Sequence, residues 1–124
     1  ANMIQLLKAF KEAEAYKGPS IIIAYAPCIS HGIEGGMENT VDMQKLAVNS
    51  GYFPLFRYNP EENKFYLDSK ADFNLYDEFL MKQNRYAALK VVNPIEMTDL
   101  LQKNKDYAIK TYEYYKSLVK EENE

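Results

Sequence analysis

The sequence predicts an α/β protein in which helices cover a mostly parallel sheet and a long helix forms the C-terminal end. Residues 2–16 place apolar side chains at steps of three and four, the period of an amphipathic helix. Residues 20–26 form an unbroken apolar run, typical of a strand that is covered on both faces. After Pro94, apolar side chains recur on one face of a long final segment.

The first two elements are joined by Gly18 and Pro19, which end the helix in the usual way. A helix, a tight turn and a buried strand make half of a doubly wound α/β unit. Residues 27–36 then break the pattern and form a loop. Ligands of open parallel sheets bind beyond the carboxyl ends of the strands, so this loop is the place where the sequence predicts a site.

The middle of the chain indicates a helix and a hairpin. Residues 37–50 have helical spacing, and Gly51 is placed to close the helix. Residues 52–58 and 64–68 predict two short strands around a turn. Pro54 indicates that the first of them is an edge strand or begins late.

The C-terminal third predicts two helices. Residues 73–89 have mixed helical spacing and suggest one helix of moderate quality. Pro94 is expected in the first turn of the last helix. The apolar face of this helix carries Met97, Leu101, Ala108, Tyr112, Tyr115 and Val119. Four tyrosines on more than one face of this helix predict partial burial against a domain or subunit: Tyr107, Tyr112, Tyr114 and Tyr115. No linker or repeat interrupts the chain, so residues 1–124 are expected to form a single unit.

Composition argues against two classes of partner. Lys and Arg number 15 and Asp and Glu 18, so the chain lacks the basic excess that nucleic acid or an anionic membrane selects. No run of about 18 uncharged apolar residues could cross a bilayer. The start lacks a signal-peptide pattern, and the absence of an initiator Met favours an upstream segment.

Cys28 is the one cysteine, so no disulfide can form within the chain. This fits a reducing compartment, and a cytoplasmic location is expected. Zinc and iron–sulfur sites need about four ligands, and a single Cys therefore cannot build one alone. If Cys28 binds a metal, the other ligands must lie outside this sequence.

The residue types leave several roles open for Cys28. His31, three residues later, suggests a nucleophile–base pair, but no protease signature surrounds it. The residue types favour a second role, a buried structural Cys. The third possible role is that of a metal ligand shared with segments outside this sequence. The neighbouring glycines do not make a phosphate-binding loop, because Met37 and Glu38 follow where Lys and Ser or Thr are needed. No catalytic or cofactor-binding residue is assigned.

Residues 18–33, with the run Ala-Pro-Cys-Ile-Ser-His-Gly-Ile, closely resemble the last domain of pyruvate:ferredoxin (flavodoxin) oxidoreductases. A run Asp-Ser-Lys at residues 68–70 strengthens this resemblance. It extends in order over most of the chain, through residues 36–37, 45–48, 51–60, 65–70, 79–80 and 84–86.

The resemblance implies a fold and a chemistry that the residues alone do not. The chain would be the C-terminal portion of a thiamine-diphosphate-binding domain, with part of the thiamine fold's sheet. The family uses thiamine diphosphate and magnesium to decarboxylate pyruvate, sends electrons through [4Fe-4S] clusters to ferredoxin or flavodoxin, and transfers the acetyl group to coenzyme A. Cys28 matches the family's fourth ligand of the cluster nearest the thiamine.

The same resemblance places the other three cluster ligands and the thiamine and magnesium motif upstream of Ala1. It implies upstream domains of the same enzyme as partners and a surface for a homodimer. The chain alone is expected to be inactive. Two alternatives remain: a non-catalytic α/β interaction module with a buried Cys28, and a relative that acts on another 2-oxoacid.

Overall fold

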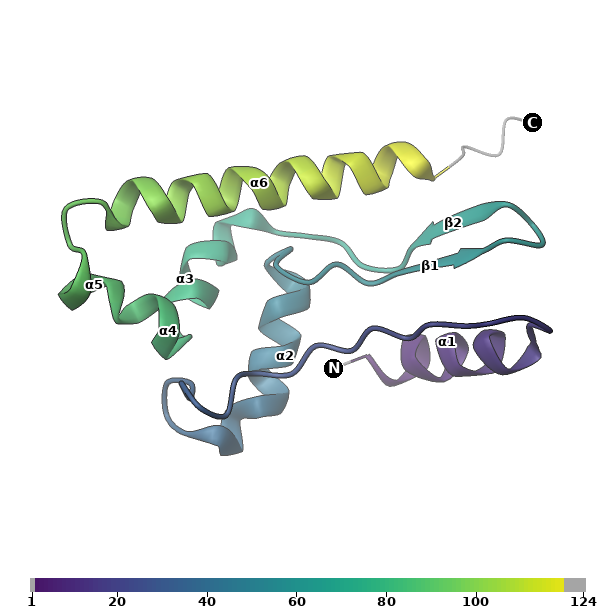
Figure 1. Cartoon of the computed structure of the whole chain (residues 1–124), viewed down its shortest axis with the longest axis horizontal. Coiled ribbons are helices and arrows are strands. Elements are labelled where there is room, and N and C mark those ends of the chain that lie inside the picture. Colours follow the sequence, from purple (N-terminus) through teal and green to yellow (C-terminus); the bar gives the residue numbers. More distant parts are fainter. Residues whose placement is uncertain (1, 120–124) are drawn as a thin grey trace.

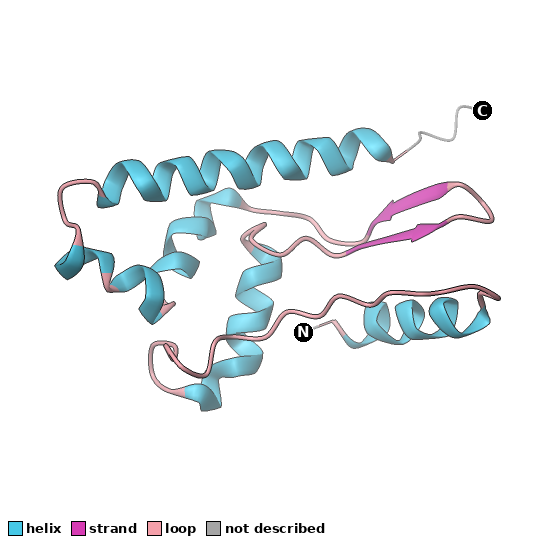
Figure 2. Ribbon diagram, in the orientation of Figure 1, coloured by secondary structure: helices cyan, strands magenta, loops and turns pink. Residues whose placement is uncertain are grey.

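The computed structural model describes residues 2–119, which form helices and one short hairpin near one end of the molecule (Figures 1 and 2). The main helices are α1 (Met3–Ala15), α2 (Thr40–Asn49), α3 (Tyr76–Met81), α4 (Asn84–Ala87), α5 (Leu89–Val92) and α6 (Met97–Leu118). Single 3-10 turns, η1 (Met37–Asn39) and η2 (Phe73–Leu75), precede α2 and α3. The strands are β1 (Phe56–Asn59) and β2 (Lys64–Leu67). No helix within the described range is long and apolar enough to cross a membrane.

The predicted first and second helices are confirmed, with local reasons for their ends. Asn2 caps α1, because its side-chain oxygen accepts a hydrogen bond from the backbone N–H of Gln5 at 3.0 Å. Gly51 follows α2 with φ of 80°. A Cβ at this position would lie 2.8 Å from the side chains of Ala71 and Phe73, so the turn needs glycine on both counts.

The α/β class is confirmed, but the predicted parallel sheet is not seen among residues 2–119. The sheet there has two strands, β1 and β2, paired antiparallel with Phe56 opposite Leu67. Residues 20–26 are not a strand, and this prediction was wrong for the described chain. A strand needs a hydrogen-bonding neighbour, whereas this segment runs back alongside α1, where the Ser20 hydroxyl donates to the Ala13 carbonyl at 3.0 Å (Figure 1).

Two further boundaries differ from the sequence prediction. The helix expected at residues 73–89 breaks at Gln83, whose backbone is extended and forms an antiparallel bridge with Ile33. The last helix begins at Met97 instead of at Pro94, which lies in a turn. That turn starts at Asn93, whose side-chain oxygen accepts from the backbone N–H of Glu96.

The hydrophobic core lies where α2, α3 and the Cys28 loop (residues 27–36) meet, with α6 packed across α3. Its buried members are Ile33, Met43, Ala47, Tyr76, Phe79 and Leu80. Phe79 and Leu80, neighbours on α3, are fully buried. Leu101 and Ala108 of α6 add to this core, while Tyr112 is buried and its hydroxyl donates to the Ser69 carbonyl at 3.0 Å.

Helix α1 joins the rest of the chain differently, through charge. Arg57 of β1 is buried and donates to both carboxylate oxygens of Asp68, at 2.6 and 2.9 Å. Its remaining nitrogen donates to Glu12 of α1 at 2.5 Å. We call these three residues the Arg57 clamp. The guanidinium also lies 4.5 Å from the centre of the Tyr66 ring, a distance suited to a cation–π contact.

Candidate functional site

The Cys28 loop starts as the extended segment reaches the hydrophobic core. Pro27 is buried, Cys28 is half-buried and His31 is exposed. The backbone N–H of Gly32 donates to the Cys28 carbonyl at 2.8 Å, which turns the chain tightly after the cysteine. Gly32 adopts a φ of 72°, a conformation that other residues seldom take. The loop then sends Ile33 into the core.

The segment between α3 and α4 holds this loop from the other side. The backbone N–H of Glu34 donates to the Lys82 carbonyl at 2.9 Å, and that of Asn84 donates to the Gly32 carbonyl at 3.3 Å. The side-chain amide of Asn84 also donates to the His31 carbonyl at 2.9 Å. These bonds bring residues 28–34 and 82–85 together across about fifty positions of sequence and set the shape of the loop.

The thiol of Cys28 is free and stands in a thiolate-stabilising environment. Its Sγ lies 3.1 Å from Nδ1 of His31. Hydrogen bonding to the His31 side chain is the largest cause that lowers the pKa of Cys28 to about 6, with help from the backbone N–H groups of His31 and Ser30 and from the Arg85 side chain. Much of the sulfur is therefore thiolate at neutral pH.

No group of three or more Cys, His, Asp and Glu side chains that could hold a metal ion occurs within residues 2–119. The thiolate of Cys28 nevertheless has the chemistry that iron–sulfur clusters and zinc require of a ligand. It is also partly open to solvent. The arrangement can supply one sulfur donor to a site whose other donors come from elsewhere.

An aromatic cluster lies against the residues that precede the loop. The ring of Tyr25 lies 5.5 Å from that of Phe53 and 6.0 Å from that of Tyr52. The hydroxyls of Tyr52 and Tyr86 are 3.0 Å apart. Burial raises the pKa of Tyr25, and the charge of Arg85 acts in the opposite direction. Arg85 is thus close enough to act on both the cysteine and the tyrosines.

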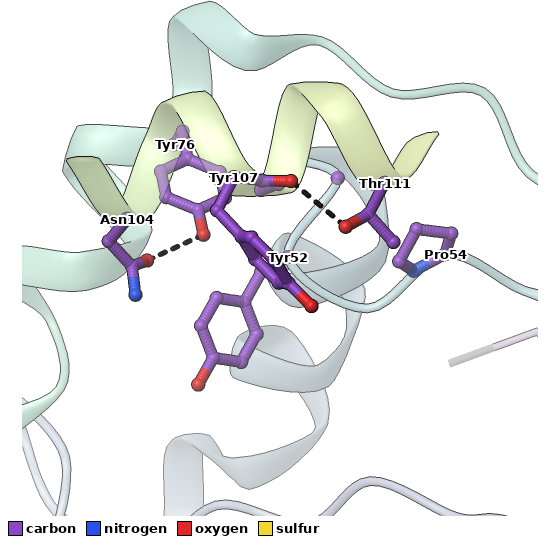
Figure 3. A pocket seen from close by; sticks show the side chains of 8 residues that line it. Tyr52, Pro54, Tyr76, Asn104, Tyr107 and Thr111 are labelled. Carbon is purple, nitrogen blue, oxygen red and sulfur yellow. Dashed lines mark hydrogen bonds between the residues drawn. The ribbon is translucent and has the colours of Figure 1, made fainter. Parts of the chain in front are cut away.

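A separate pocket of about 210 Å³ lies between α6 and the turn after α2 (Figure 3). Tyr52, Tyr76 and Tyr107 line it, with Pro54, Asn104, Ala108, Thr111 and Gly51. The Tyr76 hydroxyl donates to the Asn104 side chain at 2.7 Å, as the dashed line in Figure 3 marks. None of the lining residues is Cys, His, Lys, Arg, Asp or Glu, so this pocket lacks the usual metal ligands, and its titratable side chains are tyrosines.

The tyrosines of α6 have different surroundings, in keeping with their placement on several faces. Tyr115 packs against Phe56 and Phe65, with ring centres 4.9 and 5.8 Å apart. Tyr107 and Tyr114 are exposed, whereas Tyr112 is buried. The predicted contact of exposed tyrosines with a domain or subunit stays a prediction.

Comparison with known proteins shows which proteins contain a segment similar to this chain. No protein-family model matches it. A pyruvate:ferredoxin oxidoreductase of Moorella thermoacetica is 44% identical over 96% of the chain, and a pyruvate-flavodoxin oxidoreductase of Enterobacter agglomerans is 42% identical over 96%. The mitochondrial pyruvate dehydrogenase [NADP(+)] of Euglena gracilis is 47% identical over 82%.

The chain is homologous to a segment of these pyruvate oxidoreductases. The resemblance found in the sequence is therefore confirmed. The matched segment makes up 10% of the Moorella protein, 11% of the Enterobacter protein and 6% of the Euglena protein, so the chain spans only a small share of each relative.

Sequence reasoning singled out Cys28 and His31, and the structure brings them together. It missed Asn84, which holds the loop through a hydrogen bond, and Arg85, whose charge acts on Cys28. These two residues belong to a run that carried the family resemblance. The spacing of the sequence gave no sign that they lie next to Cys28, because the contact depends on the break in the helix at Gln83.

Proposed function

We propose that this chain is the C-terminal portion of a thiamine-dependent enzyme that oxidatively decarboxylates pyruvate, and that Cys28 supplies one ligand of a [4Fe-4S] cluster. The observation that carries the proposal is a partly open, free thiolate that belongs to no group of three or more potential metal ligands among residues 2–119. A cluster ligated by four sulfurs, three of them from other polypeptide, would use such a residue. Once bound, the cluster would carry single electrons.

The fold supports the same reading. Residues 20–26 carry an apolar, β-branched run in an extended path, and Ile21 is 87% exposed. In the proposed enzyme this segment is one strand of the parallel sheet of a thiamine-diphosphate-binding domain, and neighbouring strands come from upstream polypeptide. Residues 1–124 then form a single unit of that domain. Upstream domains also bind the thiamine diphosphate and magnesium.

The partners follow from this assignment and from the names of the relatives. Ferredoxin or flavodoxin accepts the electrons, pyruvate and coenzyme A are the substrates, and the enzyme is a homodimer. A free thiol suits a reducing compartment, and we propose the cytoplasm. The chain alone is inactive, because the thiamine site and three ligands are supplied by other polypeptide. Purified chain should give no pyruvate-dependent dye reduction, and turnover would contradict this.

The test is the substitution Cys28→Ala in the intact protein, with Ser30→Ala in the same loop as the matched control. Iron content and the electron paramagnetic resonance signals of the reduced protein are measured. We expect Cys28→Ala to lose the signal of one cluster and Ser30→Ala to keep all signals. Unchanged iron and signals in Cys28→Ala would contradict ligation and would favour a non-catalytic α/β module. Comparing pyruvate with other 2-oxoacids as substrates tests the remaining alternative.

A further inference from the structure

The Cys28 loop begins with one helical turn, which places Cys28 and His31 on the same side of the chain. The backbone N–H of Gly32 donates to the Cys28 carbonyl at 2.8 Å, which is the bond spacing of an α-helix. Residues three apart on such a turn are neighbours on its surface. Nδ1 of His31 accordingly lies 3.1 Å from the sulfur of Cys28, within hydrogen-bonding distance.

The hydrophobic core fixes both ends of this turn. Pro27 is buried directly before it, and Ile33, which is 3% exposed, enters the core directly after it. The bridge between Ile33 and Gln83 joins the second end to the segment that follows α3. The contact between the sulfur and the imidazole is therefore set by the fold and not by the local turn alone.

Asn84 adds a support that acts on His31 itself. Its side-chain amide donates to the His31 carbonyl at 2.9 Å, and its backbone N–H donates to the Gly32 carbonyl at 3.3 Å. A backbone rotation that carried the imidazole away from the sulfur would break the first of these bonds. A residue 53 positions along the chain thus holds His31 in the orientation that faces Cys28.

We propose that His31 is a positioning residue for the cluster ligand: its Nδ1–H donates a hydrogen bond to the ligating sulfur of Cys28 and raises the reduction potential of the cluster, and Asn84 holds His31 in place. This inference rests on the proposed function. A thiolate that binds iron has no proton, so the sulfur can only accept a hydrogen bond. The imidazole must then carry its hydrogen on Nδ1, the nitrogen that faces the sulfur.

The direction of the effect follows from charge. The ligating sulfur becomes more negative when one electron from the 2-oxoacid enters the cluster, and no bond is made or broken at Cys28 or at Nδ1 of His31. A hydrogen-bond donor beside the sulfur stabilises the more negative state more strongly. Removal of the donor should therefore make the cluster harder to reduce.

The experiment compares His31→Leu with His31→Asn in the intact protein. The two new side chains have the same branched shape, but only Asn keeps an N–H donor at the branch. A redox titration followed by electron paramagnetic resonance gives the potential of each cluster. We expect His31→Leu to lower the reduced-to-oxidised ratio of one cluster on the order of tenfold at a fixed potential, a shift of about 59 mV for one electron. His31→Asn should shift the same cluster less.

Two further measurements test the geometry. Asn84→Leu removes the bond to the His31 carbonyl and should lower the same potential by less than His31→Leu does, whereas Ser30→Ala should leave it unchanged. In protein labelled with ¹⁵N-histidine, pulsed electron paramagnetic resonance should detect a nitrogen coupling to this cluster that is absent from His31→Leu. An unchanged potential in Asn84→Leu would overturn the part assigned to Asn84.

The outcomes separate this inference from the proposed function. An unchanged potential in His31→Leu with the cluster retained would overturn the role of His31 and leave ligation by Cys28 intact. Equal shifts in His31→Leu and His31→Asn would contradict a hydrogen bond. If His31→Leu loses the cluster, retention in His31→Asn supports the donor, and loss in both variants contradicts a tuning role. Retention of every cluster in Cys28→Ala would overturn the proposed function itself, whatever the His31 variants show.

Discussion

Two amphipathic regions of the chain differ in how far their apolar faces are buried. Helices α2 and α3 bury their apolar faces against each other, and Phe79 of α3 is 0% exposed. Helix α1 has an equally clear apolar face, but none of its residues is buried and Phe10 is 54% exposed. The comparison teaches that helical periodicity predicts a helix and its apolar side without saying where the partner surface is.

The N-terminal arm, defined as residues 3–24, is therefore held by polar contacts, and most of its large apolar side chains face solvent. Exposed large side chains continue from α1 into the extended segment: Met3, Ile4, Leu6, Leu7, Phe10, Ile21, Ile22 and Ile23. Exposed apolar side chains in such number are typical of an interface. The packed helices form a core without help, whereas the arm presents a surface that the proposed upstream domains would cover.

The largest expected effect is on the packed side of this comparison. Phe79→Ala removes a fully buried ring and should lower the free energy of unfolding of the chain by about 3–5 kcal/mol. The matched change Phe10→Ala in α1 should cost less than about 0.5 kcal/mol, because the ring is already exposed. Urea unfolding followed by circular dichroism measures both. Equal losses would show that α1 packs in solution.

The next effect concerns the clamp that holds the arm. Arg57→Met leaves the carboxylates of Glu12 and Asp68 facing each other without their cation, and breaking a buried pair costs about 3–5 kcal/mol. Glu12 is 39% exposed, so we expect a smaller loss of about 2 kcal/mol and faster hydrogen exchange in α1.

A matched control uses the exposed pair of Lys116 and Glu113 on α6. Lys116→Met should change the free energy of unfolding by less than about 0.5 kcal/mol and leave exchange in α1 as it was. If the α1 amides of Arg57→Met stay as protected from hydrogen exchange as in the parent, other contacts hold the arm.

The sequence predicted elements whose cause is local and missed those whose cause is tertiary. The helical period sufficed for α1, and Gly51 marked the end of α2. Residues 20–26 have the composition of a strand, but a strand forms only beside another strand. Composition cannot supply that neighbour.

The candidate site also has one part with a local cause and one part with a tertiary cause. Cys28 and His31 are three residues apart, so the sequence raised their pairing, although the residue types favoured a buried structural Cys. The approach of Asn84 and Arg85 depends on Gln83 leaving the helix to pair with Ile33. No local propensity specifies that break, because it is stabilised by the loop on the other side.

A smaller effect is expected from acid on the clamp. Burial raises the pKa of Asp68, but hydrogen bonds from Arg57 and Gln5 outweigh it, so the pKa is lowered on balance. A carboxylate with a lowered folded pKa contributes stability that is complete above its unfolded value of about 3.9 and is lost as the pH falls through the folded value. The contribution of Asp68 should thus be flat from pH 7 to 5, and its loss should lower the unfolding midpoint below pH 4.

The variant Asp68→Asn isolates this contribution. It should be less stable than the parent at pH 7, and the gap should narrow as the pH falls, because the parent loses the same charge. Parallel pH profiles for the two proteins would contradict a part for Asp68 in acid unfolding.

The last prediction concerns the reactivity of the Cys28 thiol, which lies where the arm meets the packed helices. It involves the smallest effect on stability and separates the two regions most sharply. In the chain without a cluster, alkylation by iodoacetamide should rise through a midpoint near pH 6, because the thiolate is the nucleophile and hydrogen bonding to His31 lowers its pKa to about 6. His31→Ala should move that midpoint up toward about 8.5. Arg57→Met, which loosens the arm, should leave it unchanged, because the bonds that shape the loop come from residues 82–84 and not from α1. A midpoint that moves with Arg57→Met would show instead that the arm sets the geometry of the cysteine and that the two regions are coupled.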